Sequence, residues 1–189
     1  MANKSLIVRT VTGLIEPAIR SRADRLFVLT AGRPGSQKHK PTFSTYYETG
    51  LVVALYEFLL MSPDLAHLEI SHERSYQART RPEQVDIWIK PPNGGHPTLI
   101  ECGDFAPAKV KADARKMRRL NPNGINWFLA FFRDDWHAKN PWARLKYCRS
   151  RKGSLKGMHL ALEEKFTGTF AINLPQQEIH FGWAMIRVN

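Results

Sequence analysis

Two short strand-like segments on either side of a turn place the strongest constraint on the fold of this chain. In the first segment apolar residues alternate with polar ones, and the apolar positions are Val85, Ile87 and Ile89. Because side chains alternate along a strand, Asp86 lies on the opposite face. The turn contains Asn93-Gly94, a dipeptide typical of two-residue hairpin turns, in which both positions need positive φ. The sequence therefore predicts an antiparallel hairpin.

The register of this hairpin decides how close two acidic residues come. If Asn93-Gly94 forms the turn, the numbers of paired residues sum to 187, and Asp86 faces Glu101 with Cβ atoms about 5 Å apart. The flanking prolines could widen the loop, and a slip of two residues would keep the face but separate the pair. Two adjacent carboxylates repel each other, so a bound divalent cation would turn an unfavourable pair into a metal site.

A third acid lies on the helix predicted over residues 43–61, which Thr42 or Ser44 can cap and Ser62-Pro63 ends. The second half of this helix is apolar almost all round, as is typical of a buried helix. Glu48 shares a stripe with Leu51, Val52, Leu55 and Leu59. A carboxylate on this stripe is unfavourable unless a cation meets it. The alternative is a half-exposed carboxylate that the helix N-terminus stabilises.

A second helix is predicted over residues 107–120, with Pro107 at its first position. It carries one acid, Asp113, and six cations: Lys109, Lys111, Arg115, Lys116, Arg118 and Arg119. A solvated face is the alternative, but the imbalance favours a helix that faces phosphate. The continuous apolar run over residues 125–132 then predicts a strand buried on both faces.

The overall charge indicates a polyanionic partner. Lys and Arg number 28 against 17 Asp and Glu, which gives a net charge of +11. Such an excess predicts attraction to nucleic acid, with a ribosome-associated role or simple solubility as alternatives. Beyond the second helix, the cations expected to contact a nucleic-acid backbone are Lys38, Lys40, Arg144, Lys146, Arg149, Arg151 and Lys152.

The ends of the chain are expected to add structure to one domain of 189 residues. Residues 11–25 suggest a helix and residues 26–30 a short strand. Segments 168–174 and 178–187 are expected to form a closing hairpin.

Membrane insertion and a disulfide framework are not expected. No uninterrupted apolar run approaches the roughly 20 residues of a membrane span, and the apolar stretch near the start is too short for a signal peptide. The only cysteines, Cys102 and Cys148, do not form a disulfide scaffold or a zinc site. We therefore expect a soluble, cytoplasmic protein.

The order helix, three strands, basic helix and buried strand, with acids at Glu48, Asp86 and Glu101, resembles the core of the PD-(D/E)XK nuclease superfamily. The resemblance covers about residues 43–132, flanked by a basic N-terminal segment (1–42) and a basic C-terminal extension (133–189). It implies an α/β (α+β) fold: a mixed central sheet flanked by helices, with a restriction-endonuclease-like αβββαβ core and an extra C-terminal β-hairpin.

The resemblance also implies a set of site residues and a cofactor. Asp86, Glu101 and the backbone carbonyl of Cys102 would bind Mg²⁺ or Mn²⁺, and Glu48 would bind or orient an outer-shell water. Metal-activated water would then attack a phosphodiester. The family's lysine falls two residues after the glutamate, where this chain has Gly103. In some relatives the lysine has moved to the following helix, which makes Lys109 and Lys111 the candidates.

Three functions remain open on these grounds. The first is a Mg²⁺-dependent DNA endonuclease. The second is an inactive nuclease-fold protein that binds DNA or serves as an assembly subunit, alone, as a homodimer or with protein partners. The third is an unrelated basic RNA- or DNA-binding protein whose acids are structural. Gly103 favours the second, whereas the presence of all three acids favours the first.

Overall fold

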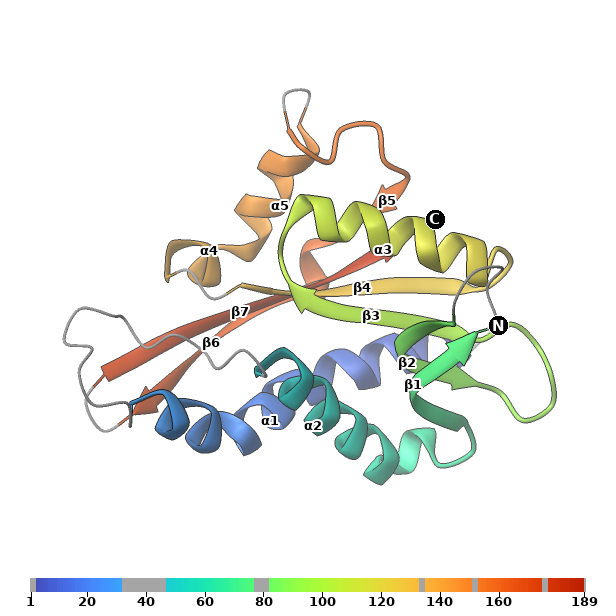
Figure 1. The fold of residues 1–189 in the computed structure, drawn as a ribbon, viewed down its shortest axis with the longest axis horizontal. Helices are drawn as coiled ribbons and strands as arrows, with labels where there is room; N and C mark the ends of the chain where they lie inside the picture. The colour runs from blue at the N-terminus through green and yellow to red at the C-terminus, as the bar shows by residue number, and fades with distance from the viewer. Residues whose placement is uncertain are drawn as a thin grey trace.

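A seven-stranded mixed sheet forms the centre of the described structure (Figure 1). The computed structural model describes residues 3–31, 47–76, 82–132, 135–150, 153–174 and 177–188. Lys38, Lys40, Arg151, Lys152 and the expected cap residues Thr42 and Ser44 lie outside these ranges.

The strands follow the order β1-β2-β3-β4-β7-β5, and β6 pairs with β7 outside this path. Their bounds are β1 (Glu69–Tyr76), β2 (Glu83–Lys90), β3 (Thr98–Asp104), β4 (Ile125–Phe132), β5 (Leu160–Ala161), β6 (Thr167–Leu174) and β7 (Gln177–Val188). The helices are α1 (Asn3–Ala31), α2 (Tyr47–Met61), α3 (Pro107–Leu120), α4 (Asp135–Lys139) and α5 (Pro141–Arg149), with 3₁₀ turns η1 (Pro63–Leu65) and η2 (Glu164–Phe166).

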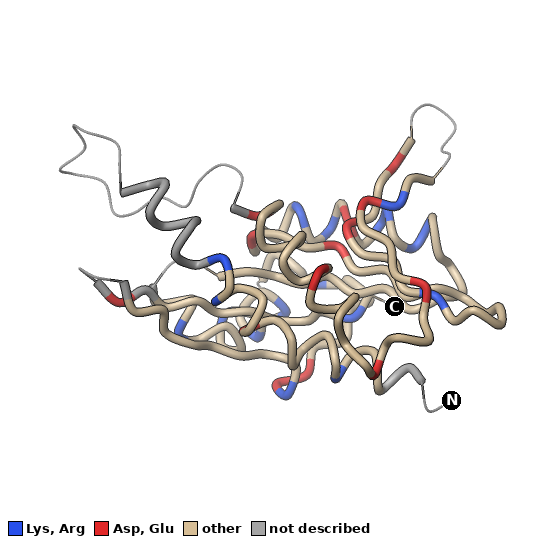
Figure 2. Tube along the Cα trace, turned by 90° about the horizontal axis from the view of Figure 1, so that it is seen from below, with Lys and Arg blue, Asp and Glu red and all other residues tan. Residues whose placement is uncertain are grey.

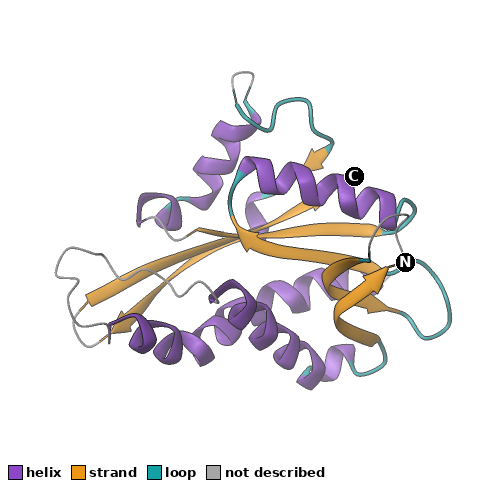
Figure 3. Ribbon diagram, in the orientation of Figure 1, coloured by secondary structure: helices purple, strands orange, loops and turns teal. Residues whose placement is uncertain are grey.

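Helices cover both faces of the sheet (Figure 3). On one face α1 and α2 pack against a cluster that includes Ile87, Ile100 and Leu129. On the other face α3, α4 and α5 pack against a cluster that includes Leu99 and Phe128. Burying both faces of the sheet removes apolar side chains of β4 from water on either side, as the continuous apolar run in its sequence predicts.

The hairpin of β2 and β3 has the predicted register but a different turn. The pairs Ile87–Ile100, Trp88–Leu99 and Ile89–Thr98 each sum to 187. Positive φ occurs at Gly94 and Gly95, at 85° and 103°, and not at Asn93, so the predicted two-residue turn is wrong. Prolines cannot donate a backbone hydrogen bond. Pro91, Pro92 and Pro97 therefore end the ladder early and leave a wider loop.

The connection from β3 through α3 to β4 places these two strands side by side and parallel. Both α3 and β4 have the bounds predicted from the sequence. Because the carboxyl end of β3 leads directly into α3, the first turns of this helix pass over the end of the strand.

The two ends of the chain agree with the expectations in part. The strand expected over 26–30 is wrong, because α1 continues as a helix to Ala31. A short apolar run fits either element, so its periodicity alone does not decide between them. The C-terminal hairpin is confirmed as β6 and β7, and β7 also pairs with β4, which makes it part of the central sheet. Among the described residues, no helix is long and apolar enough to cross a membrane.

Candidate functional site

The three predicted acids approach the carboxyl end of β3 from two layers of the structure. Asp86 on β2 and Glu101 on β3 share the face that α3 covers, since the alternating neighbours Ile100 and Cys102 belong to the opposite cluster. Glu48 comes from the first turn of α2, on the other side. Its Oε2 accepts a hydrogen bond of 3.3 Å from the backbone N–H of Asp104. Acids from α2 and β2 therefore both bond to backbone N–H groups near the end of β3.

The Asp86 side chain connects β2 to β3 at the position where their backbone ladder ends. Its Oδ2 accepts a hydrogen bond of 2.7 Å from the backbone N–H of Cys102. The β2–β3 ladder ends one residue before Asp86, at the pair Ile87–Ile100. Burial raises the pKa of the Asp86 carboxyl, while the Cys102 N–H and the ammonium groups of Lys116 and Lys109 oppose that rise.

Glu101 is the most deeply buried of the three acids, with 4% of its surface exposed. Its Oε1 lies 2.6 Å from Nζ of Lys116. Burial, followed by the negative charge of Asp86, raises the pKa of Glu101 to about 8, although Lys116 favours the charged form. The β2–β3 register continues to Asp86 opposite Glu101 on the same face, so the two carboxylates repel each other when both are charged.

Lys109 lies where a side chain at position 103 would project. A Cβ atom built on Gly103 would overlap Nζ of Lys109 and would lie 2.6 Å from Oε1 of Glu48. The Lys109 ammonium forms an ion pair with this same Glu48 oxygen. Burial lowers the pKa of Lys109, but the hydrogen bond and charge of Glu48 outweigh it and raise the pKa overall. Glycine at 103 thus leaves room for a lysine that comes from the next helix.

The lysine that sequence analysis paired with Lys109 as a candidate is not at the site. Lys111 is not among the groups that contact the three carboxylates in the described part of the chain. Lys116, which we expected to face phosphate, points inward instead. Its ammonium contacts Glu101, approaches Oδ1 of Asp113 to 3.8 Å and donates to the Gln84 carbonyl at 3.0 Å.

Spacing along α3 could have identified these additional residues. Lys109, Asp113 and Lys116 are separated by four and three positions, so they lie on one stripe of the helix. This stripe runs beside the buried stripe of Val110, Ala114 and Met117. Burial also raises the pKa of Asp113, against the charges of Lys116 and Lys109. The signal in the sequence is the spacing of these residues, which the number of cations on the helix does not reveal.

Two of the residues fit a hard divalent cation, but the described residues do not form a complete metal site. Asp86 and Glu101 supply adjacent carboxylate oxygens, the ligand type that Mg²⁺ prefers. No group of three His, Cys, Asp or Glu side chains within the described ranges is arranged to hold a metal ion. Glu48 is paired with Lys109 and Glu101 with Lys116.

Cations expected to contact nucleic acid differ in how they are held. Figure 2 shows Lys and Arg positions distributed along the described trace instead of gathered at one end. Arg118 donates to the His159 carbonyl at 2.7 Å, Arg149 donates to the Met158 carbonyl, and Arg119 pairs with Glu83. The Arg144 guanidinium lies 5.9 Å from the centre of the Phe105 ring. Two others, Arg115 on α3 and Lys146 on α5, are exposed.

Comparisons with known proteins add no family to this geometry. No family model, no curated protein and no solved structure matches the chain.

Proposed function

We propose that the protein is a Mg²⁺-dependent DNA endonuclease with a restriction-endonuclease-like core that spans α2 to β4. The observation that carries the proposal is the position of the Lys109 ammonium, which lies above Gly103 and beside Glu48. The proposal treats Lys109 as the functional replacement for the lysine that position 103 lacks. The order α2-β1-β2-β3-α3-β4, with β1, β2 and β3 antiparallel and β4 parallel to β3, supports it.

In this proposal Asp86 and Glu101 would hold the divalent cation when it binds, with the Cys102 carbonyl as a further oxygen ligand and Glu48 in support. The cation supplies charge stabilisation and a more acidic bound water. The reaction is hydrolysis: a water oxygen forms a bond to phosphorus, the P–O bond to the leaving oxygen breaks, and the water proton passes to that oxygen or to solvent.

Lys109 acts as a cation and not as a base. Its pKa is raised by Glu48, so the side chain stays protonated at neutral pH. A protonated lysine cannot accept a proton, but it can donate a hydrogen bond to the negative charge that develops on the phosphate. Glu48 holds Lys109 in place for this role.

One observation favours a second candidate, an inactive nuclease-fold subunit that binds DNA. Each predicted acid already has a partner from the protein: the Cys102 N–H for Asp86, Lys116 for Glu101 and Lys109 for Glu48. Such a network balances the buried charges without a metal ion. In this candidate exposed cations such as Arg115 and Lys146 bind DNA, and the acids only stabilise the fold.

The test combines calorimetric titration of Mn²⁺ with a plasmid-nicking assay on wild type, Asp86→Asn and Lys109→Met. Asp64→Asn is the matched control, since Asp64 is exposed on η1. Asparagine at 86 still offers an oxygen to the Cys102 N–H but loses the charge. We expect Asp86→Asn to abolish the heat of metal binding and to reduce nicking by at least ~100-fold.

The outcomes separate the two candidates. Lys109→Met is expected to bind Mn²⁺ like wild type and to lose nicking by a similar factor, because it removes the cation and not a ligand. Nicking by Asp86→Asn at the wild-type rate would overturn the proposal. DNA binding by a wild-type protein that neither binds Mn²⁺ nor nicks would support the inactive subunit instead.

A further inference from the structure

Two large aromatic side chains are exposed on the helices that follow the carboxyl end of β4. Trp136 on α4 is 59% exposed, and Tyr147 on α5 is 65% exposed. The other exposed large apolar residues in the described ranges, Leu60 and Met61, are not aromatic and lie together at the end of α2. Single exposed apolar residues are common on protein surfaces, so the two rings become informative through what surrounds them.

The segment that carries both rings is basic and contains no acid. From residue 136 to residue 162 the sequence has no Asp or Glu, whereas its cations are Lys139, Arg144, Lys146, Arg149, Arg151, Lys152 and Lys156. Lys146 is exposed on α5 directly before Tyr147. A cation beside an exposed ring suits a nucleic-acid strand, because the phosphate meets the cation while a base stacks on the ring.

Both helices lie at the edge of the sheet that the three carboxylates approach. β3 and β4 are parallel, so their carboxyl ends share one edge, and Figure 1 shows α4 and α5 beyond the arrowhead of β3. There the Phe105 ring stacks on Phe132 with centroids 4.9 Å apart, and the Arg144 guanidinium of α5 lies 5.9 Å from the centre of the Phe105 ring. Phe105 directly follows Asp104, whose backbone N–H donates to Glu48. A chain of contacts therefore connects α5 to the candidate site.

Packing of the two helices against the core turns both rings toward solvent. α4 lies on β7, where a Cβ at Gly182 would be 2.5 Å from the carbonyl oxygen of the buried Ala138. Trp136 is two positions before Ala138, which corresponds to about 200° around a helix, so its side chain projects from the opposite side. In the same way, Tyr147 is two positions after the buried Leu145 of α5. The rings are thus held outward on anchored helices.

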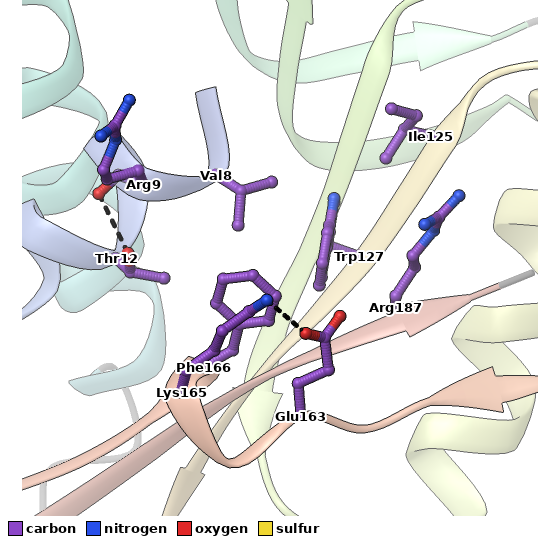
Figure 4. Close-up of a pocket in the computed structure, with 9 residues that line it drawn as sticks. All are labelled: Val8, Arg9, Thr12, Ile125, Trp127, Glu163, Lys165, Phe166 and Arg187. Carbon is purple, nitrogen blue, oxygen red and sulfur yellow. Dashed lines mark hydrogen bonds and ion pairs between the residues drawn. The ribbon is translucent and has the colours of Figure 1, made fainter. Parts of the chain in front are cut away.

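The pocket of about 490 Å³ on the opposite face of the sheet does not offer such a surface (Figure 4). Its walls include Trp127, which is only 4% exposed. The guanidinium groups of Arg9 and Arg187 lie on opposite sides of Trp127 and point away from each other. A base cannot stack on a ring that is buried, so the exposed rings of α4 and α5 are the ones suited to stacking.

We propose that α4 and α5 hold an unpaired strand of the DNA substrate, with bases stacked on Trp136 and Tyr147 and a phosphate against Lys146. The inference rests on the proposed function, since it takes the carboxylates at the end of β3 as the point of cleavage. It adds the substrate class, which is DNA with a single-stranded segment beside the scissile phosphate. In a duplex each base face is covered by the next base pair, so stacking on these rings would first require unstacking.

The experiment measures fluorescence anisotropy of a labelled oligothymidylate and of a blunt duplex, each about 12 nucleotides or base pairs long, at one salt concentration. EDTA is present throughout, so that binding does not depend on the proposed metal site. We expect wild type to bind the single strand at least ~10-fold more tightly than the duplex. Trp136→Ala and Tyr147→Ala should each weaken single-strand binding ~10-fold, because each removes one stacking surface. Both positions are exposed, so the variants should fold.

Two kinds of control separate stacking from a general loss of apolar surface. Trp136→Phe and Tyr147→Phe keep a ring and should remain within ~3-fold of the wild-type affinity. Met61→Ala removes a side chain that is 68% exposed at the end of α2 far from Glu48, and it should leave binding unchanged.

Each outcome decides for or against the strand-binding surface. A duplex that binds as tightly as the single strand would overturn the proposal, as would alanine variants that bind the single strand like wild type. Phenylalanine variants that lose as much affinity as the alanine variants would also overturn it. The expected binding pattern, together with no cleavage of the single strand in Mn²⁺, would support the surface and count against the endonuclease activity alone.

Discussion

Gly103 and Lys109 illustrate how one residue's missing side chain determines where another lies. The space in which a Cβ at 103 would project is filled by the end of the Lys109 side chain. A substitution at 103 therefore acts on the Lys109–Glu48 pair, although neither of those residues is changed. Position 103 therefore probes the ion pair together with the local backbone, because the φ of Gly103 is 156°, a conformation that other residues rarely adopt.

We predict that Gly103→Ala displaces Lys109 and reduces plasmid nicking by ~10-fold or more. The added methyl group would overlap Nζ of Lys109 and lie 2.6 Å from Oε1 of Glu48. Gly13→Ala is the control, because a Cβ at 13 has no atom within 4 Å and the position is in the interior of α1. Alanine there should stabilise the helix slightly. Equal activity of both variants would contradict the prediction.

The buried carboxyl of Glu101 makes stability depend on pH. Its pKa in the folded protein is about 8, above the ordinary 4.5 of a glutamate in the unfolded chain. The folded state therefore holds the proton more tightly between these values, and stability falls as pH rises through them. The slope from this one group is about 1.4 kcal/mol per pH unit.

We predict that the free energy of unfolding in EDTA decreases from pH 6 to pH 8 in wild type and much less in Glu101→Gln. Urea denaturation at several pH values measures this difference. Glu164→Gln, an exposed acid on η2, should retain the wild-type slope. A Glu101→Gln variant that keeps the full slope would show that other groups cause it.

At the scale of elements, two buried amides join the end of α3 to the start of β4. Asn121 and Asn126 are both 3% exposed. The Asn121 side chain donates to Oδ1 of Asn126 and to the Pro97 carbonyl, both at 2.9 Å, and Asn126 donates to the Asn121 carbonyl at 3.1 Å. These bonds tie the α3–β4 turn to the loop before β3, and so fix α3 relative to the sheet.

We predict that Asn126→Ala destabilises the protein by about 1–3 kcal/mol, because it removes the acceptor of one Asn121 amide N–H and a donor to the Asn121 carbonyl, both buried. Asn123→Ala, in the same turn but exposed, should change stability by less than about 0.5 kcal/mol. Urea unfolding of the two variants makes the comparison. If both variants lose the same free energy of unfolding, the Asn121–Asn126 pair does not stabilise this junction.

At the scale of the whole molecule, the net charge of +11 is spread over several elements (Figure 2). Part of it is paired with acids of the fold, as at Lys109, Lys116 and Arg119. Cations without such partners are the ones that can release counterions when they contact phosphate. Total charge therefore overstates the number of phosphate contacts.

We predict that Lys146→Ala lowers the slope of log K against log salt for DNA binding by about one unit. Arg20→Ala should change it little, since Arg20 lies on α1 in the opposite layer and pairs with Glu16 at 2.8 Å. Fluorescence anisotropy at several salt concentrations measures both slopes. Identical slopes in Lys146→Ala and wild type would show that Lys146 does not contact the DNA phosphates.

Local pattern was sufficient for most elements. The alternation over β2, Pro107 at the start of α3 and the apolar run of β4 each depend on residues close together in sequence, and each prediction agrees with the structure. The prediction of a strand at 26–30 was wrong because α1 continues to Ala31. A short apolar run fits both a helix and a strand, so the sequence pattern did not separate them. The prediction of a two-residue turn at Asn93-Gly94 was wrong because the three flanking prolines end the ladder early and leave a wider loop.

By itself the sequence determined the three carboxylates, their placement on one helix and two strands, and the register that brings Asp86 toward Glu101. Only the tertiary structure decided that Lys109 fills the space above Gly103, that Lys116 turns inward to Glu101, and that Trp127 and Arg187 share a pocket with Arg9. The physical reason is the range of the interactions. Periodicity and turn chemistry act over a few residues, whereas ion pairs and pockets depend on how distant elements pack together.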